Sequence, residues 1–263
     1  MYQVTFSIVL YNNSVSELEA LMNSISLIKL KKHTYVIDNS SSVLLKEFFK
    51  KYDDVEYINP GKNLGYGNAN NIAINRVDGI TKYHVVINPD VIFKEGTVEA
   101  LYDFMERHTD IGQIMPKIVY ENGSIQRLCK LLPKPSNLIV RRFFKNIGFQ
   151  VSREYELSDF DYSYTLDVPI LSGCFMFLRY DILKRTGGFD KRFFIYMEDF
   201  DLTRRMGQLS RTVFYPHAEA THSFRKESYQ NTKMLFYHIL SAIKYFNKWG
   251  WLYDAERIRI NKK

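Results

Sequence analysis

The chain has 263 residues, of which 46% are hydrophobic and 15% aromatic, so it can bury a sizeable core and is not a disordered protein. Its formal net charge of +7 favours an anionic partner, such as nucleic acid, an anionic membrane surface or a phosphorylated substrate. The two cysteines, Cys129 and Cys174, lack the CxxC spacing, which argues against a disulfide scaffold or a zinc site and is compatible with a reducing cytosol.

The N-terminus runs straight into a strand pattern, without the charged segment and cleavage site of a signal peptide. No apolar run approaches the ~18 residues that are needed to span a bilayer. We therefore expect a protein that is soluble or peripheral to a membrane and that works in the cytoplasm.

Strand-like runs alternate with amphipathic helical patterns in the first part of the chain. Ser14 and Glu17 have the spacing of a capping box, and the apolar residues that follow recur at helical spacing. The expected strands are residues 4–11, 34–37, 55–58 and 83–87, and the expected helices begin after Ser14 and cover 43–51, 69–76 and 96–108. This βαβ alternation predicts an α/β fold with a Rossmann-like, mostly parallel central sheet flanked by helices.

The second part of the chain has a mixed pattern. Asn122-Gly123 indicates a hairpin turn between two strand-like runs, and Ser172-Gly173 interrupts a third. The expected strands are residues 111–120, 124–128, 168–178 and 211–215, and the expected helices are 180–185, 199–206 and 228–249. Since no clear linker is visible, we expect one unit over residues 1–225, with halves at 1–110 and 111–225, and a C-terminal helical appendage at 226–263.

A polar tripeptide, Asn88-Pro89-Asp90, follows the expected strand 83–87. Pro89 has no N–H to donate and therefore ends the strand. In open α/β sheets, ligands bind at the carboxyl ends of the strands, and a carboxylate there suits a divalent cation that is shared with phosphate oxygens. Taken alone, the tripeptide is more often an ordinary turn that ends a strand.

A loop rich in Asn and Gly, residues 63–70, precedes the expected helix 69–76. Gly65 and Gly67 would let backbone N–H groups approach a ligand, and the start of a helix favours an anion. The loop is neither a G-x-G-x-x-G motif nor a P-loop. A tight turn between a strand and a helix explains it equally well.

Acidic residues and a histidine mark two further candidate positions. Glu198, Asp199 and Asp201 fall in the first turn of an expected helix, where they either stabilise the helix end or supply a general base. His222 is expected in a loop after the strand 211–215. A lone histidine is usually structural, and a metal role requires that the fold bring a carboxylate close to it.

Taken together and in this order, these pieces resemble the inverting nucleotide-sugar glycosyltransferases of family two, which have the GT-A fold, and in particular their bacterial rhamnosyltransferase-like branch. The resemblance runs from Val4 to about Ser223. It rests on eight short motifs in register: Val9-Leu10-Tyr11-Asn12, Ile37-Asp38-Asn39-Ser40, Asn63-Leu64-Gly65-Tyr66-Gly67-x-x-Asn70, Asn88-Pro89-Asp90, Ser172-Gly173-Cys174-Phe175, Gly187-Gly188-Phe189-Asp190-x-x-Phe193-Phe194, Glu198-Asp199-x-Asp201-Leu202-x-x-Arg205 and His222.

The resemblance implies a role for each motif. Residues 1–110 would bind the nucleotide sugar, and residues 111–225 would hold the acceptor and the catalytic residues. Asp199 would be the catalytic base with Glu198 in support, and Asp90 and His222 would hold Mg²⁺ or Mn²⁺, with Asn88 standing where many relatives have an Asp. The implied nucleotide-sugar residues are Tyr11, Asn12, Asp38, Asn63, Gly65, Gly67, Asn70 and Asn88, and the implied acceptor residues are Ser172, Gly173 and Arg205.

The implied reaction moves a sugar, with rhamnose from dTDP-rhamnose as the first choice, onto a hydroxyl of a lipid-diphosphate-linked glycan in bacterial O-antigen or capsule synthesis. A UDP-hexose or UDP-galactofuranose is the alternative donor. A non-catalytic relative that binds nucleotides or other anions explains the charge but not the joint presence of Asp90, Asp199 and His222. A nucleotidyltransferase would need a Gly-rich, basic signature near the N-terminus, which the chain lacks. We expect no nucleic-acid partner.

Two segments mix basic and aromatic residues, at 141–145 and 244–251. Peripheral membrane segments have this composition, and an anionic membrane at the inner face of the cell membrane is the candidate partner. A solvated surface with an oligomer contact explains the same residues about as well. The oligomeric state stays open.

Overall fold

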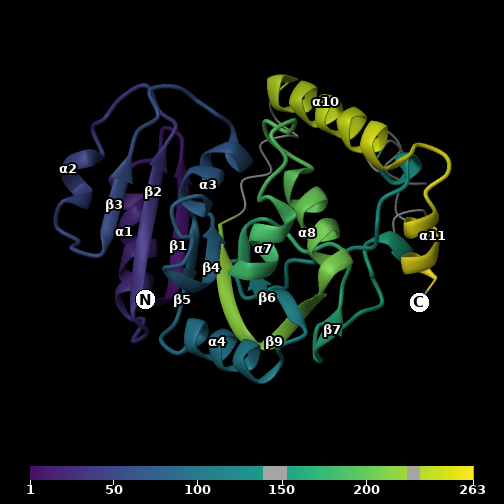
Figure 1. Ribbon diagram of the computed structural model, residues 1–263, viewed down its shortest axis with the longest axis horizontal. Helices are drawn as coiled ribbons and strands as arrows, with labels where there is room; N and C mark the ends of the chain where they lie inside the picture. Colours follow the sequence, from purple (N-terminus) through teal and green to yellow (C-terminus); the bar gives the residue numbers. More distant parts are fainter. Residues whose placement is uncertain (139–152, 224–231, 263) are drawn as a thin grey trace.

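The structure is a computed structural model that describes residues 1–138, 153–223 and 232–262. Within these residues the chain forms one nine-stranded sheet in the order β3-β2-β1-β4-β8-β6-β9-β5, with β7 paired to β9 (Figure 1). The strands are β1 Tyr2–Leu10, β2 Lys32–Asp38, β3 Val55–Ile58, β4 Thr81–Ile87, β5 Val91–Phe93, β6 Ile111–Val119, β7 Leu166–Asp167, β8 Phe175–Arg179 and β9 Arg211–His222.

The first four consecutive strands are parallel, because β1 pairs in parallel with β2 and β4, and β2 with β3. In the second half, β8 is antiparallel to β4 and β6, while β6 runs parallel to β9. Both β5 and β7 are antiparallel to β9. The predicted α/β fold, with a parallel first half and a mixed second half, is confirmed.

Helices cover both faces of the sheet, as the alternation of side chains along the strands requires. On β1, Phe6 and Ile8 pack into the core that holds Leu18 of α1 and Leu101 of α4, while Val9 packs into the core shared with α3, α7 and α8. The helices are α1 Val15–Ser26, α2 Lys46–Phe49, α3 Tyr66–Ile74, α4 Thr97–Arg107, α7 Tyr180–Thr186, α8 Glu198–Leu209, α10 Thr232–Trp249 and α11 Ala255–Asn261. The capping box of Ser14 and Glu17 is present at α1.

The structure differs from the sequence-based expectations at several elements. The helix expected at 43–51 shortens to α2, and the strand expected at 124–128 is reduced to one bridge between Val119 and Ile125. The strand expected at 168–178 begins only at Phe175. Helix α11 and strand β5 were not predicted, since both are short. Within the described residues, no helix is long and apolar enough to cross a bilayer.

Strand β9 runs on to His222, so the expectation that His222 lies in a loop is wrong. The pairing of β9 with β6 jumps from Tyr215 to Glu219, which is a bulge over Pro216–Ala218. A bulge accommodates a proline that an unbroken ladder would exclude, so the strand continues past a residue that normally ends one.

The C-terminal helices pack on α8. Arg204 of α8 forms a bidentate, nearly fully buried ion pair with Asp254, with both N···O distances at 2.7 Å. The indole N–H of Trp249 donates to Asp201 at 2.9 Å. Figure 1 shows α10 lying next to α8. The boundary predicted between residues 225 and 226 lies outside the described residues, and so does the basic segment 141–145.

Candidate active site

The turn between β4 and β5 places Asp90 beside the end of β9. Because β5 pairs with β9 in the register Val91 to His222, the residue before Val91 lies next to the histidine. Asp90 Oδ1 is 3.4 Å from His222 Nε2. The N–H of Ser223 also donates to the carbonyl of Asp90 at 3.1 Å, which fixes the turn against the strand end.

Gln126 selects the tautomer of the neutral His222 ring. Its amide nitrogen donates to the carbonyl of His222 at 2.6 Å, so its oxygen is the atom that faces His222 Nδ1 at 3.0 Å. An oxygen in that place accepts a hydrogen bond from the N–H at Nδ1, and Nε2 of the neutral ring then carries the lone pair. That nitrogen faces Asp90, which is the arrangement of a metal-binding histidine held by a second residue.

Asp90 and His222 together fit a divalent cation. Mg²⁺ binds its ligands at about 2.0–2.1 Å, so atoms 3.4 Å apart can serve one cation. No group of three or more His, Cys, Asp or Glu residues suited to a metal occurs in the part of the chain that the structure describes. The protein would therefore supply two ligands, and water and phosphate oxygens would supply the others. Asn88 adds no charge here, and its amide nitrogen lies 3.5 Å from His222 Nε2.

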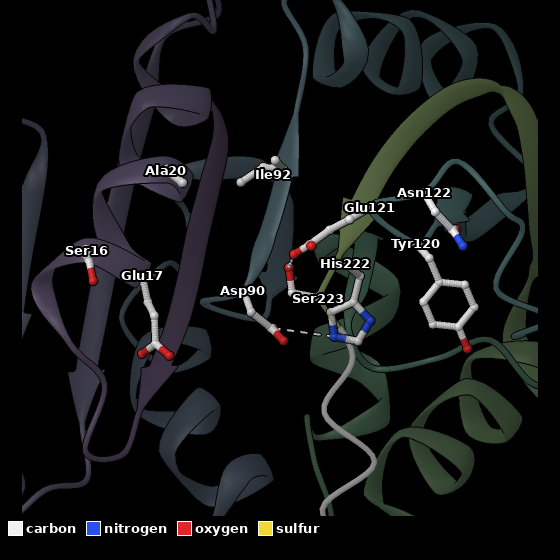
Figure 2. A pocket seen from close by; sticks show the side chains of 10 residues that line it. All are labelled: Ser16, Glu17, Ala20, Asp90, Ile92, Tyr120, Glu121, Asn122, His222 and Ser223. Atoms are coloured by element: carbon white, nitrogen blue, oxygen red, sulfur yellow. Dashed lines mark hydrogen bonds and ion pairs between the residues drawn. The ribbon is translucent and has the colours of Figure 1, made fainter.

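A pocket of about 740 Å³ opens next to this pair. Figure 2 shows Asp90 and His222 pointing toward one another, with Glu17 on one side and Tyr120 on the other. Among the residues that the structure describes, the lining includes the carboxylates of Glu17, Asp90 and Glu121 and no lysine or arginine. A diphosphate would be repelled from such a lining unless a divalent cation bridged it to the protein.

The carboxylate of Asp199 is held by two backbone N–H groups at the start of α8. Gly173 donates to Oδ2 and Phe200 donates to Oδ1, both at 2.9 Å. Burial raises the pKa of Asp199, and the two backbone donors and the charge of Lys130 partly offset that rise. A Cβ at position 173 would stand 3.0 Å from the Asp199 side chain, so any larger residue there would press on the Asp199 side chain.

Glu198 is buried beside Asp199. Burial, and then the charge of Asp199, raise the pKa of Glu198 to about 8, so its carboxyl group is mostly protonated at neutral pH. Among the described residues its Oε2 has no hydrogen-bond partner. The negative charge of the pair therefore resides on Asp199.

The backbone just before this pair is strained. Tyr196 and Met197 have φ values of 67° and 64°, in the left-handed region that residues with a Cβ rarely adopt. Such strain persists only where the surrounding structure over-determines it, and it clusters at functional sites. Helix α10 supplies part of that constraint, because Ser241 donates to the carbonyl of Ile195 at 2.8 Å and Lys244 to that of Arg192 at 2.7 Å.

The buried thiol of Cys174 is close enough to Asp90 and Asp199 to feel both charges. Burial raises the pKa of its thiol to about 12, and the charges of Asp90 and Asp199 both contribute to the rise. Its carbonyl accepts the N–H of Asn88 at 2.9 Å, which joins the strand that carries Asn88 to the turn that holds Asp199. The candidate metal ligands and the candidate base are thus linked through the adjacent residues Gly173 and Cys174.

The residues predicted for the nucleotide sugar have mostly internal contacts. Asp38 is buried, and its oxygens accept from Tyr57 Oη at 2.7 Å and from the N–H of Ser40 at 2.9 Å. Asn70 is also buried and accepts from the Ser7 hydroxyl at 2.6 Å. The exposed residues of the set are Tyr11, Asn12 and Asn63, and Asn88 lies beside His222. Their assignment to the nucleotide stays a prediction.

Gly65 and Gly67 lie against the loop before α8. A Cβ on Gly65 would stand 2.1 Å from the carbonyl oxygen of Phe194, and one on Gly67 would stand 2.9 Å from Cβ of Phe189. The N–H of Tyr66 already donates to that Phe194 carbonyl at 2.9 Å. Packing against this loop therefore accounts for both glycines without a bound phosphate.

Substituting Gly65 tests this contact. Gly65 and Gly61 have φ values of 82° and 76°, so alanine strains the backbone at both, but only at Gly65 does it meet another atom. We expect Gly65→Ala to lower the free energy of unfolding by about 1–3 kcal/mol more than the matched control Gly61→Ala. Urea unfolding measures both, and equal losses would mean that the Phe194 loop is not held by this glycine.

The residues predicted for the acceptor divide into two groups. Gly173 directly contacts Asp199, and Ser172 precedes it, so both lie at the candidate base. Arg205 instead forms an ion pair with Asp201, in which Nε lies 2.8 Å from Oδ2, and it donates to the carbonyls of Thr186 and Gly188. Its contacts in the structure are internal, and its role toward an acceptor stays a prediction.

Sequence reasoning missed Gln126 and Lys130. Gln126 fell in an expected strand, and nothing in the sequence connects it with His222, 96 positions away. Lys130 was one of several basic residues, and only the fold places its charge close enough to Asp199 to act on the pKa.

Comparison with known proteins gives a family and a fold. The profile described as "Glycosyl transferase family 2" matches residues 5–187. The chain is 29% identical over 188 residues to the N-acetylglucosaminyl-diphospho-decaprenol L-rhamnosyltransferase of Mycobacterium tuberculosis, a match that covers 66% of this chain and 60% of that protein. It is 27% identical over 228 residues to the rhamnosyltransferase WbbL of Escherichia coli, with 80% of each covered.

Solved structures resemble the chain over nearly its whole length. The structure of GalNAc-T7 with UDP, GalNAc and Mn²⁺ has a TM-score of 0.64 at 14% identity and covers 92% of this chain and 48% of that one. The mannosyltransferase PcManGT of Pyrobaculum calidifontis, in complex with GDP-Man and Mn²⁺, has a TM-score of 0.60 at 17% identity and covers 92% of this chain and 64% of that one.

Proposed function

Since the chain belongs to glycosyl transferase family 2 and has the GT-A fold of its structural neighbours, we propose that it is an inverting, metal-dependent glycosyltransferase. The observation that carries this proposal is that the Asp90–His222 pair and the anchored carboxylate of Asp199 are linked through neighbouring backbone, since Cys174 accepts from Asn88 and Gly173 donates to Asp199. Transfer of a sugar from a nucleotide requires a metal site that binds the diphosphate and a base that is positioned next to it.

The chemistry follows from these residues. A divalent cation at Asp90 and His222 would stabilise the negative charge that develops on the leaving nucleotide diphosphate. Asp199 accepts the proton of the acceptor hydroxyl as that oxygen attacks the anomeric carbon. The bond to the nucleotide breaks as the new bond forms on the opposite face of the sugar, so the configuration inverts. Protonated Glu198 keeps a second charge away from the base.

For the donor and the acceptor we propose rhamnose from dTDP-rhamnose and a glycan linked to a lipid diphosphate, in the synthesis of a bacterial surface polysaccharide such as O-antigen or capsule. Support comes from the relatives that are named rhamnosyltransferases, one of them for a decaprenol-diphosphate-linked sugar. The acceptor would be met in the cytoplasm at the inner face of the cell membrane. A UDP-sugar such as a UDP-hexose or UDP-galactofuranose is the alternative donor.

Thermal shift and donor turnover test the proposal. We expect dTDP to raise the melting temperature only when Mn²⁺ or Mg²⁺ is present, because the three carboxylates in the described lining repel a bare diphosphate, and we expect dTDP-rhamnose to be consumed. Stabilisation by UDP in place of dTDP would point to the alternative donor. Metal-dependent nucleotide binding without turnover of any sugar in a donor panel would identify a non-catalytic relative.

A further inference from the structure

The outward face of α10 is apolar. The opposite face is buried and carries Ser241 and Tyr245. On the outside, Phe236, Ile239 and Ile243 are 59%, 44% and 38% exposed, and their spacing of three and four residues places them on one stripe. A helix on a protein surface normally has charged or polar residues there, so a large apolar stripe indicates that something covers it.

Further apolar side chains follow at the end of the helix. Leu252 is 94% exposed, and Trp251 and Tyr253 on either side of it are exposed as well. Trp and Tyr are enriched where a protein meets the headgroup region of a bilayer, because each has an apolar ring and one polar group. Below, the outer stripe of α10 together with residues 251–253 is called the α10 surface.

The charge of α10 selects among the candidate partners. The helix contains Lys233, Lys244 and Lys248 and no acidic residue. Lys248 is paired with Asp190 and Asp201, whereas the exposed Lys244 donates to the carbonyl of Arg192, a neutral group. Two copies of α10 packed face to face would bring like charges together, so a second copy is disfavoured. An anionic surface with an apolar interior satisfies both the lysines and the stripe.

We propose that the α10 surface docks on an anionic lipid bilayer. The stripe enters the boundary between headgroups and acyl chains, and lysines at its edge attract the anionic headgroups.

The buried side of the same helix holds the strained loop that leads into Asp199, through Ser241 and the carbonyl of Ile195. Docking therefore brings to the membrane the helix that holds the loop before the candidate base. This consequence rests on the proposed lipid-linked acceptor, whereas the docking itself does not.

Vesicle flotation with the full chain tests the docking. The vesicles contain phosphatidylcholine alone or phosphatidylcholine mixed with phosphatidylglycerol, at low and at high salt. We expect the protein to float with the anionic vesicles at low salt and to be released by salt, since surface charge attraction is screened. The triple variant Phe236→Gln/Ile239→Gln/Ile243→Gln should lose binding about tenfold or more, because three apolar side chains no longer enter the bilayer.

The matched control is Val43→Gln/Leu44→Gln, which removes two exposed apolar side chains far from α10 in the sequence and should float like the parent protein. Absence of flotation of the parent protein at low salt, or equal flotation of the triple variant, would overturn the proposal. So would a dimer in sedimentation that the triple variant converts to monomers, since a second copy would then cover the stripe. Nucleotide-dependent thermal shift of the triple variant separates this outcome from a failure of the proposed function.

Discussion

Asp199→Asn is expected to lower the rate of sugar transfer about 10²–10⁴-fold, the usual contribution of a general base. Asparagine has nearly the same shape, and its Oδ1 still accepts one of the backbone N–H groups of Gly173 and Phe200. The fold and the metal-dependent binding of the nucleotide should therefore persist. Transfer kinetics and the thermal shift with nucleotide and Mn²⁺ measure the two properties separately.

Glu198→Gln is the matched control for this prediction. Because Glu198 is mostly protonated at neutral pH, the neutral glutamine changes little at its position, and the loss of rate should be far smaller than for Asp199→Asn. Asp199 and Glu198 are adjacent in the chain, so what distinguishes the two variants is the charge that each removes. If Asp199→Asn kept a near-normal rate, or if Glu198→Gln lost as much, the assignment of the base to Asp199 would be wrong.

The pH dependence of transfer gives an independent measure. Asp199 acts only when deprotonated, and burial raises its pKa above the ordinary value. The rate of the parent enzyme should therefore be high above that raised pKa and fall as the pH drops through it. The residual rate of Asp199→Asn should lack this acidic limb, which a purely structural role of Asp199 would not predict.

The sequence contained enough to predict the first half of the sheet, since βαβ alternation and β-branched runs act locally. It also placed Asp90 at a strand end, which the structure confirms. The predicted end of β9 before Pro216 was wrong. The strand continues through a bulge, and a bulge is determined by the pairing with the neighbouring strand and not by the residue that occupies it. Contacts between distant residues were beyond sequence reasoning, and Gln126 on His222 is the clearest case.

The glycines of residues 63–70 also show what the sequence alone cannot predict. A Gly-rich loop at a helix start suggests a phosphate cradle, yet the structure fills the space above Gly65 with the Phe194 carbonyl. The sequence pattern correctly predicted a close backbone approach. It did not reveal whether the approaching group is a ligand or the protein itself.

Substitutions at the Asp90–His222 pair are expected to remove the metal dependence of nucleotide binding. Asp90→Ala deletes the charged ligand, and His222→Ala deletes the nitrogen ligand, so each should abolish or sharply reduce the stabilisation that Mn²⁺ confers together with the nucleotide. Isothermal titration of Mn²⁺ in the presence of the nucleotide measures the effect. An unchanged Mn²⁺ affinity in either variant would contradict the proposed ligand.

Gln126→Leu gives the most specific form of this prediction, because it leaves both proposed ligands in place and removes the residue that orients the ring. Without the oxygen of Gln126, Nδ1 loses its acceptor and the ring no longer holds Nε2 toward Asp90 in one tautomer. Loss of such a partner typically costs about 10–100-fold in metal affinity. Glu121→Gln is the control, since Glu121 lines the same pocket but is bonded to Ser223 and lies outside the pair. If Glu121→Gln weakened Mn²⁺ as much as Gln126→Leu, the charge of the whole pocket, and not the oriented histidine, would be what binds the metal.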